Sequence, residues 1–332
     1  MEYDFSEDVD KIWPALLFVG AFVAAVGGLL FVLDILPRWG KGKERLQMFG
    51  FLGPALVLLG IGLVYPLVRT ITLSFYNNSR GSFVGIDNYS WIVTNDETLI
   101  MLRNTLIWVV CVPLLATAFG LLYAVLVDKA RGEGIAKSLI FMPMAISLVG
   151  ATIIWKFVYA YREAGEEQIG LLNQVLVWFG MEPQQFLTSS PSNTFYMIIM
   201  MIWIQAGFAM VILSAAIKAI PSEIIEAARL DGANPWQMFW KVTMPSIRPA
   251  VVVVTITITI ATLKVFDIVR TSTNGNFKSS VLAFEMYNQA FRLSDDPSGE
   301  GRGAALAVVL FLLVVPIVAY QVRQLRQRAE IR

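Results

Sequence analysis

The stretch KAIPSEIIEAARLDGANPWQMFWKVTMPSIRP, from Lys218 to Pro249, is a polar segment between two long apolar runs. Its first half predicts a short helix from Glu223 to Asp231. Ser222 is a favourable N-cap residue ahead of that helix, and Gly232 can adopt the left-handed backbone that ends a helix. The first half of the stretch is therefore expected to form a compact surface helix.

The second half of the stretch predicts another helix. Asn234 is expected to cap it and Pro235 to begin it, since proline is favoured at the first helical position. We expect this helix to run toward Thr243 and to end at Pro245. The whole segment is then a helix-turn-helix hinge that lies on the face of the membrane.

The first helix of the hinge offers a surface for close docking. Ala227 and Ala228 carry almost no side-chain bulk, and Ile224 and Ile225 add apolar area beside them. Such a surface suits a groove of another protein.

Composition places the rest of the chain in lipid. Of its 332 residues, 56% are hydrophobic and 15% are charged, whereas soluble proteins hold about 25% charged residues. The net charge of +1 offers no basic surface for nucleic acid. Histidine is absent and Cys111 is the sole cysteine, so the sequence offers no ligand set for zinc, iron or copper and no disulfide.

Seven apolar runs approach the length of about 20 residues that a membrane-spanning helix needs. Each is expected to be a helix, because an open strand edge cannot be satisfied in lipid. The fold class is therefore an all-α integral membrane protein with about seven transmembrane helices. The runs lie near Ile12 to Leu36, Phe49 to Phe75, Thr105 to Val127, Ser138 to Tyr159, Thr194 to Ala219, Pro249 to Val269 and Gly303 to Val322.

The distribution of positive charge predicts the orientation. Segments after the first, third, fifth and seventh runs hold more than half of the 26 Lys and Arg residues, most of them in short loops. Lys and Arg are retained on the cytoplasmic side of a membrane. We therefore expect the N-terminus outside and the C-terminus in the cytoplasm.

The spacing within the polar loop carries a family resemblance. Glu226-Ala227-Ala228, three residues, Gly232, nine residues and then Val242-Thr243-Met244-Pro245 resemble the EAA loop of binding-protein-dependent ABC importer permeases, with Val and Met in place of the usual Ile and Leu. The resemblance implies that the loop forms a coupling helix seated in a cleft of the ATP-hydrolysing subunit. The residues that it assigns to coupling are Glu226, Ala227, Ala228, Asp231 and Gly232. The alternative is an ordinary interfacial loop in which alanine and glycine only shape a turn.

The resemblance extends to the C-terminal half, where the pattern is similar to carbohydrate-uptake permeases such as the larger maltose permease subunit and the alpha-glucoside permeases. It departs from them at Asn276-Phe277, where Gly-Pro is commoner. The matching residues are Phe266-Asp267, Thr273-Asn274-Gly275, Tyr287, Phe291 and Gly303-Ala304-Ala305.

The resemblance also implies a division of the chain. Residues 49–332 would be a six-helix type I permease core with the coupling loop at 218–249, and residues 1–48 would add one transmembrane helix and a cytoplasmic linker. The implied partners are a second homologous permease, an ATPase dimer that binds ATP and magnesium, and a periplasmic or lipid-anchored sugar-binding protein. The implied location is a bacterial inner membrane. Residues 1–332 hold no G-x-x-x-x-G-K-[ST] pattern, so the energy is expected to come from the ATPase partner.

Candidate cargo contacts come from two sources. Sugars are bound through hydroxyl hydrogen bonds and aromatic faces, and Trp203 and Gln205 are such groups inside the fifth run. The similarity to the maltose subunit adds positions matching Gln205, Ile258, Thr262 and Val265, and one near Met144. Instead of contacting cargo, the threonines of the sixth run could donate to backbone carbonyls of their own helix. Gln205 could likewise donate to a carbonyl of a neighbouring helix instead of a sugar hydroxyl.

The function predicted is therefore permeation of a di- or oligosaccharide, with an alpha-glucoside such as trehalose, sucrose or maltose in first place. One alternative is a permease for another small solute such as glycerol phosphate. Another is an ion-coupled secondary transporter, which needs intramembrane carboxylates or unwound helices that the sequence does not clearly offer. An enzyme is not expected, since no nucleophile-base pair or metal set is evident.

Overall fold

The structure, a computed structural model, describes residues 13–14, 16–24, 26–28, 31, 52–78, 81–128, 131–292 and 297–329. The chain forms two compact units, Met1–Thr70 and Ile71–Arg332. The described residues are helical apart from loops and one isolated β-bridge between Tyr76 and Phe83, which confirms the all-α class.

The first unit contains apolar helix with no packed face of its own. The described residues between Leu16 and Gly28 are helical, and most of the expected first run lies outside the described residues. Leu52–Leu73 is an apolar helix that contains a π-helical turn, η1 (Gly60–Val64), continues as α3 (Tyr65–Leu73) and reaches the first residues of the second unit. None of its described residues is buried within the structure.

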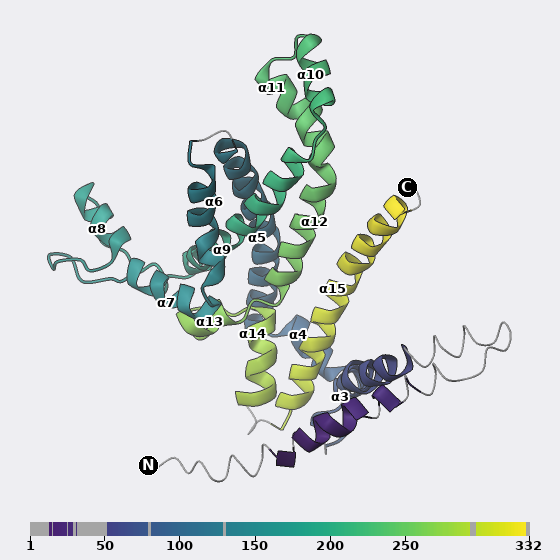
Figure 1. Cartoon of the computed structure of the whole chain (residues 1–332). Helices are drawn as coiled ribbons and strands as arrows, with labels where there is room; N and C mark the ends of the chain where they lie inside the picture. The colour runs from purple at the N-terminus through teal and green to yellow at the C-terminus, as the bar shows by residue number, and fades with distance from the viewer. Residues whose placement is uncertain are drawn as a thin grey trace. The chain divides into compact units, whose positions relative to one another are not determined.

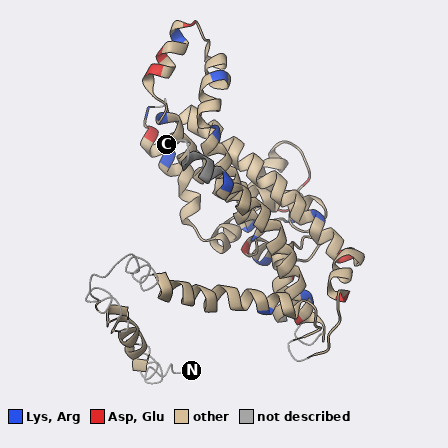
Figure 2. Cartoon of the chain, turned by 90° about the vertical axis from the view of Figure 1, so that its right-hand side faces the viewer, with Lys and Arg blue, Asp and Glu red and all other residues tan. Residues whose placement is uncertain are grey.

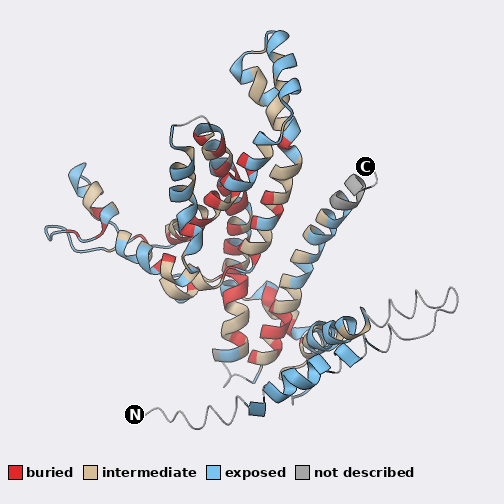
Figure 3. Cartoon of the chain, viewed as in Figure 1, coloured by how far each residue is buried: buried red, intermediate tan, exposed pale blue. Residues whose placement is uncertain are grey.

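Three long helices form the centre of the second unit. These are α5 (Asp96–Val127), α9 (Ser192–Lys218) and α12 (Met244–Leu263) (Figure 1). Buried residues gather where they meet (Figure 3), and α5 and α9 approach so closely that a Cβ on Gly120 would lie 2.4 Å from the Cβ of Ala209. Small residues at helix contacts are how membrane helices pack closely.

A second buried cluster joins the ends of several helices. It contains Ile92 of α4 (Asp87–Thr94), Met101 of α5, Leu282 of α14 (Leu282–Tyr287) and Leu306 of α15 (Gly299–Ala329). The remaining elements here are α13 (Asp267–Ser272) and the π-helical turn η4 (Asn288–Arg292). Figure 1 shows these segments toward the end of α12 that is opposite the coupling loop.

The fourth apolar run is not a straight span. It forms α6 (Glu133–Phe141), a 3₁₀ turn η2 (Met142–Ala145) and α7 (Leu148–Val158), and the two parts are bent by 103°. The single helix expected over Ser138 to Tyr159 is therefore wrong, because the run is broken into two helices. Pro143 lacks a backbone N–H, and Ser147 adopts an extended backbone and caps the Gly150 N–H, which starts a new helix.

In the described part of the chain, five helices are long and apolar enough to cross a membrane, and the bent pair makes up to six. Figure 2 shows that these helices are uncharged over most of their length. A short apolar helix, α8 (Leu171–Trp178), lies in the segment between α7 and α9 and is too short to span.

Candidate functional site: the coupling loop and the cargo path

The helix expected from Glu223 to Asp231 is present as α10 (Ser222–Leu230). It ends as predicted, because Gly232 has a φ of +79°. The Gly232 N–H donates to the Arg229 carbonyl and the Ala233 N–H donates to the Ala228 carbonyl, both at 3.0 Å. This is the double hydrogen bond of a Schellman helix end.

The start of α10 differs from the prediction. Pro221 occupies the N-cap position and Ser222 is already the first helical residue, with no capping hydrogen bond from a side chain. The ring of Pro221 presets its φ at −55°, and its carbonyl accepts from the Ile224 N–H at 3.2 Å, so the helix begins without a hydroxyl cap. The N-cap role expected of Ser222 is therefore wrong.

The second helix of the loop begins as predicted. The Asn234 side chain accepts from the Gln237 N–H at 2.8 Å, and the Gln237 side chain accepts from the Asn234 N–H at 3.1 Å, which is a capping box. Pro235 is the first residue of α11 (Pro235–Gln237).

The second helix does not end at Pro245. It continues through a π-helical turn, η3 (Met238–Thr243), into α12, so that Pro235–Leu263 is one span. A proline ring normally clashes with the carbonyl four residues earlier. The wider π turn just before Pro245 moves that carbonyl out of the way, and the helix can pass through.

The predicted coupling residues face outward. Glu226, Ala227, Asp231 and Gly232 are exposed and Ala228 is partly buried. Apolar side chains surround them without cover, with Leu230 89% and Trp236 71% exposed. A surface of this kind at the tip of two long helices, where Figure 1 places α10 and α11, requires another protein or the membrane interface against it.

Trp203 lies in an aromatic pocket between α5, α6, α7 and α9. Its ring meets that of Trp155 edge to face, with centroids 5.8 Å apart. The pocket has a volume of about 410 Å³, within the range of small-ligand sites. Its other lining residues are Phe119, Tyr123, Leu139, Ile140, Pro143, Ile199, Ile202 and Ala206. Sequence analysis missed Phe119, Tyr123 and Trp155, although aromatic residues inside apolar runs were the feature that identified Trp203.

The other candidate cargo residues lie elsewhere. Ile258 and Val265 belong to the buried core of this chain, and the Thr262 hydroxyl donates to the Ile258 carbonyl of its own helix at 2.7 Å. Met144 lies in the bend between α6 and α7 and is 42% exposed. Gln205 is partly buried on α9, and its amide has no hydrogen bond within the described part of the chain.

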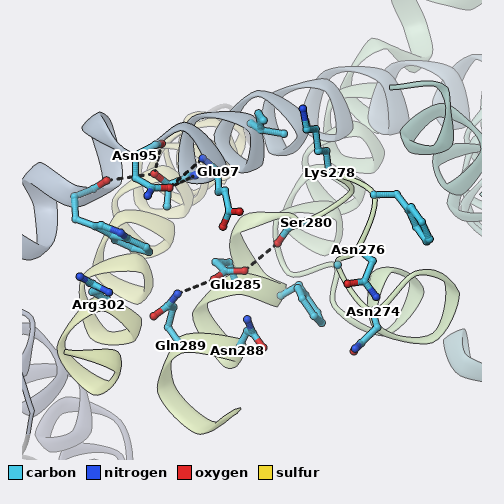
Figure 4. A pocket seen from close by; sticks show the side chains of 16 residues that line it. Asn95, Glu97, Asn274, Asn276, Lys278, Ser280, Glu285, Asn288, Gln289 and Arg302 are labelled. Carbon is cyan, nitrogen blue, oxygen red and sulfur yellow. Dashed lines mark hydrogen bonds between the residues drawn. The ribbon is translucent and has the colours of Figure 1, made fainter. Parts of the chain in front are cut away.

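A second, polar pocket of about 590 Å³ is lined by residues of α4, α5, α14, η4 and α15 and of the loop before α14 (Figure 4). Glu285 is held in its lining, since its carboxylate accepts from the Gln289 amide at 2.8 Å and from the Ser280 hydroxyl at 3.2 Å. Asn274, Phe277 and Lys278 contribute from a loop in which all three have positive φ values. Non-glycine residues in this conformation are strained and concentrate at functional surfaces.

Buried amides hold that loop in place. Asn104 donates to the carbonyls of Lys278 and Ser280 at 2.8 and 3.1 Å, and Asn193 donates to the carbonyl of Phe277 at 2.9 Å. The sequence departs from the carbohydrate-uptake pattern at Asn276-Phe277, and the loop found there is rigidly supported.

Apolar spans around a tightly packed helix core, joined to an exposed helix-turn-helix loop, define a multi-span transport subunit. Residues 99–329 match the family of binding-protein-dependent transport system inner membrane components. The chain belongs to this family of ABC permeases, which are transport subunits and not enzymes.

Curated relatives match almost the full length. The chain is 52% identical over 330 residues to the alpha-glucoside transport system permease protein AglF of Rhizobium meliloti (strain 1021), covering 95% of this chain and 97% of the relative. It is 47% identical to the osmoprotective compounds uptake permease protein GgtC of Synechocystis sp. (strain ATCC 27184 / PCC 6803 / Kazusa), covering 85% of this chain and 100% of that protein.

A solved structure confirms the fold. A chain of a bacterial alginate ABC transporter, crystallised in complex with an alginate pentasaccharide-bound periplasmic protein, superposes with a TM-score of 0.72 at 21% identity. The match covers 85% of this chain and 95% of that chain.

Proposed function

We propose that this chain is the permease subunit of an ATP-driven importer for a neutral di- or oligosaccharide, with alpha-glucosides such as trehalose, sucrose or maltose as the expected cargo. The observation that carries the proposal is the 52% identity to an alpha-glucoside permease over 95% of the chain. The aromatic pocket around Trp155 and Trp203 agrees with it, since its lining residues carry no charge. A neutral sugar ring suits such a lining, whereas glycerol phosphate would require cationic groups.

The coupling loop is proposed to seat in a cleft of the partner ATPase. Ala227 and Ala228 allow close approach, the exposed apolar side chains supply buried area, and the Gly232 helix end fixes the shape of the surface. ATP and magnesium bind to the ATPase dimer, whose closure is transmitted through the loop. The two permeases then rock so that the cargo path opens on alternate sides.

The cargo path is proposed to include Trp203 and Gln205, whose side chains are only partly buried. Met144 is proposed to belong to the same path, at the bend between α6 and α7. Ile258, Thr262 and Val265 are buried in the chain's own core, so contact with cargo at these positions requires the alternating movement to separate α12 from its neighbours. The experiment on Gln205 below tests the path.

The remaining partners follow from the same assignment. A second homologous permease covers the exposed apolar faces of the second unit, and lipid covers the rest. The protein is proposed to lie in a bacterial inner membrane with its N-terminus outside and C-terminus in the cytoplasm, with residues 1–48 as an additional helix and linker and residues 49–332 as the permease core. The polar pocket near Glu285 then faces outward, where a sugar-binding protein docks.

Reconstitution tests this function. The chain would be assembled with its second permease and ATPase pair in proteoliposomes, with the sugar-binding protein added outside. We expect ATP-dependent uptake of radiolabelled trehalose, sucrose or maltose that glycerol 3-phosphate does not reduce. Uptake of glycerol phosphate with no uptake of these sugars would overturn the cargo assignment, and uptake driven by an ion gradient without ATP would overturn the class of transport.

A further inference from the structure

Five side chains form an ionic cluster where three helices end on the same side of the second unit. Lys137 of α6 donates at 2.7 Å to Asp128, next to the end of α5, and at 2.7 Å to Glu133, at the start of α6. Ser214 of α9 donates to Asp128 at 2.6 Å and accepts from Lys137. Lys218, the last residue of α9, donates to Glu133.

The cluster is balanced and partly removed from water. Two carboxylates face two ammonium groups, and the exposed fractions of the side chains fall to 11% for Asp128 and 20% for Lys137. An isolated exposed ion pair contributes little to stability. A partly buried network in which each charge has two partners holds its helices in one geometry, because removing one charge leaves another without compensation.

A backbone contact fixes the same helices at a second point. A Cβ on Gly207 of α9 would lie 2.5 Å from the carbonyl oxygen of Ile140 of α6. The backbones of α6 and α9 therefore touch there, and Gly207 lies about two turns before Ser214 along α9. Two attachment points prevent α6 from turning or sliding independently of α9.

The cluster lies between the coupling loop and the aromatic pocket. Lys218 ends α9, and α10 begins only four residues later at Ser222. On the other side, α6 runs from Glu133 to the bend, where Ile140 and Pro143 line the pocket that contains Trp203. Any movement at the start of the coupling loop, next to Lys218, is therefore transmitted to α6, which forms one wall of the pocket.

We infer that the cluster of Asp128, Glu133, Lys137, Ser214 and Lys218 is a positioning element that transmits movement of the coupling loop through α6 to the bend and the aromatic pocket. The inference rests on the proposed coupling role of α10. It assigns a transport role to the turn between α5 and α6, outside the coupling loop itself. Lys137 is the central member, since it alone bonds to residues of all three helix ends.

The test uses the complete transporter in proteoliposomes and measures both sugar uptake and ATP hydrolysis. In Lys137→Met, we expect ATP hydrolysis to continue while the uptake per ATP falls at least about fivefold, the lower end of typical allosteric couplings. Lys137→Arg keeps the charge and should restore the ratio. Arg131→Met is the matched control, because it removes an exposed cation from the same turn, and its ratio should equal that of the original chain.

A second position guards against a variant that fails to fold. Lys218 is 52% exposed, so substitutions there disturb packing little. Lys218→Glu sets a carboxylate beside Glu133 and Asp128 and should lower the uptake per ATP, whereas Lys218→Arg keeps the charge and should retain it. An unchanged ratio in Lys137→Met and Lys218→Glu, or an equal loss in Lys218→Arg and Lys218→Glu, would overturn the inference. Gly232→Val tests the loop separately: if it uncouples transport while the cluster variants do not, only this inference fails.

Discussion

The ring of Trp203 on α9 meets edge to face the ring of Trp155 on α7, the helix that follows the bend in the fourth apolar run. These two side chains come from positions far apart in the sequence, and both line the aromatic pocket. An aromatic pair of this kind contributes about 0.5–1.5 kcal/mol beyond its buried area. The bend brings the Trp155 ring to the pocket, so the contribution of the two rings to uptake can be tested.

Replacing Trp203 by Leu should weaken sugar uptake. Leucine keeps the site apolar but removes the ring face on which a sugar would stack. We therefore expect the sugar concentration that gives half-maximal uptake to rise about two- to tenfold. ATPase stimulation by the loaded binding protein should persist, because the coupling loop is unaltered. Trp178→Leu is a control, since Trp178 is 72% exposed and does not line the pocket. An equal loss of uptake in both variants would show that the loss does not arise from the pocket.

Gly232→Val should uncouple ATP hydrolysis from uptake. A β-branched residue at a φ of +79° is strained, so the end of α10 must change shape although no atom lies within 4 Å of the new Cβ. We expect the loaded binding protein to stimulate ATP hydrolysis poorly, while the protein still inserts in the membrane.

The structure supplies a matched control for that substitution. Gly180 follows α8, has a φ of +72° and likewise has no atom within 4 Å of a new Cβ. Gly180→Val should place similar strain in the segment between α7 and α9 and leave ATPase stimulation unchanged. Normal stimulation in Gly232→Val, or the same loss in both variants, would remove α10 from its proposed role.

Gly120→Val should destabilise the second unit. Its Cβ would lie 2.4 Å from the Ala209 Cβ and 2.8 Å from the Met210 backbone nitrogen, so α5 and α9 must separate. Overpacking of this kind costs about 1–3 kcal/mol, and thermal unfolding in detergent should occur at lower temperature. Gly62→Val is the control, because no atom lies within 4 Å of a Cβ at Gly62. Equal unfolding temperatures for the Gly120 variant and the original chain would contradict the close packing described here.

How far the sequence predicted this structure depends on how local each feature is. Gly232 and the Asn234-Pro235 pair act within one helix turn, and both behave as their chemistry requires. Pro245 was misjudged because the π turn that tolerates it depends on the backbone of the preceding residues. The bend at Pro143 was missed because an apolar run has the same hydropathy whether it is straight or broken.

The candidate site likewise contains features that are local in the sequence and features that depend on tertiary packing. The predicted coupling residues lie close together along the chain, on α10 and in the turn that ends it, so their spacing alone placed them together. The pocket draws its lining from four different helices, and only tertiary packing shows that Phe119 and Trp155 join Trp203. The ionic cluster was missed for the same reason, since Asp128 and Ser214 are 86 residues apart.

Gln205→Leu tests whether the cargo path passes along α9. The Gln205 amide is partly buried and has no hydrogen bond within the described part of the chain, so a sugar hydroxyl or a group of the second permease is its expected partner. Leucine removes the amide and keeps most of its volume. Losing a neutral hydrogen bond costs about 0.5–1.5 kcal/mol, so sugar uptake should weaken about two- to tenfold while ATPase stimulation survives. Gln205→Asn, which keeps the amide on a shorter side chain, should retain more uptake than the leucine variant if the amide holds sugar. Unchanged uptake in Gln205→Leu, or a parallel fall in uptake, ATPase stimulation and folded protein, would make the residue structural and move the cargo path away from it.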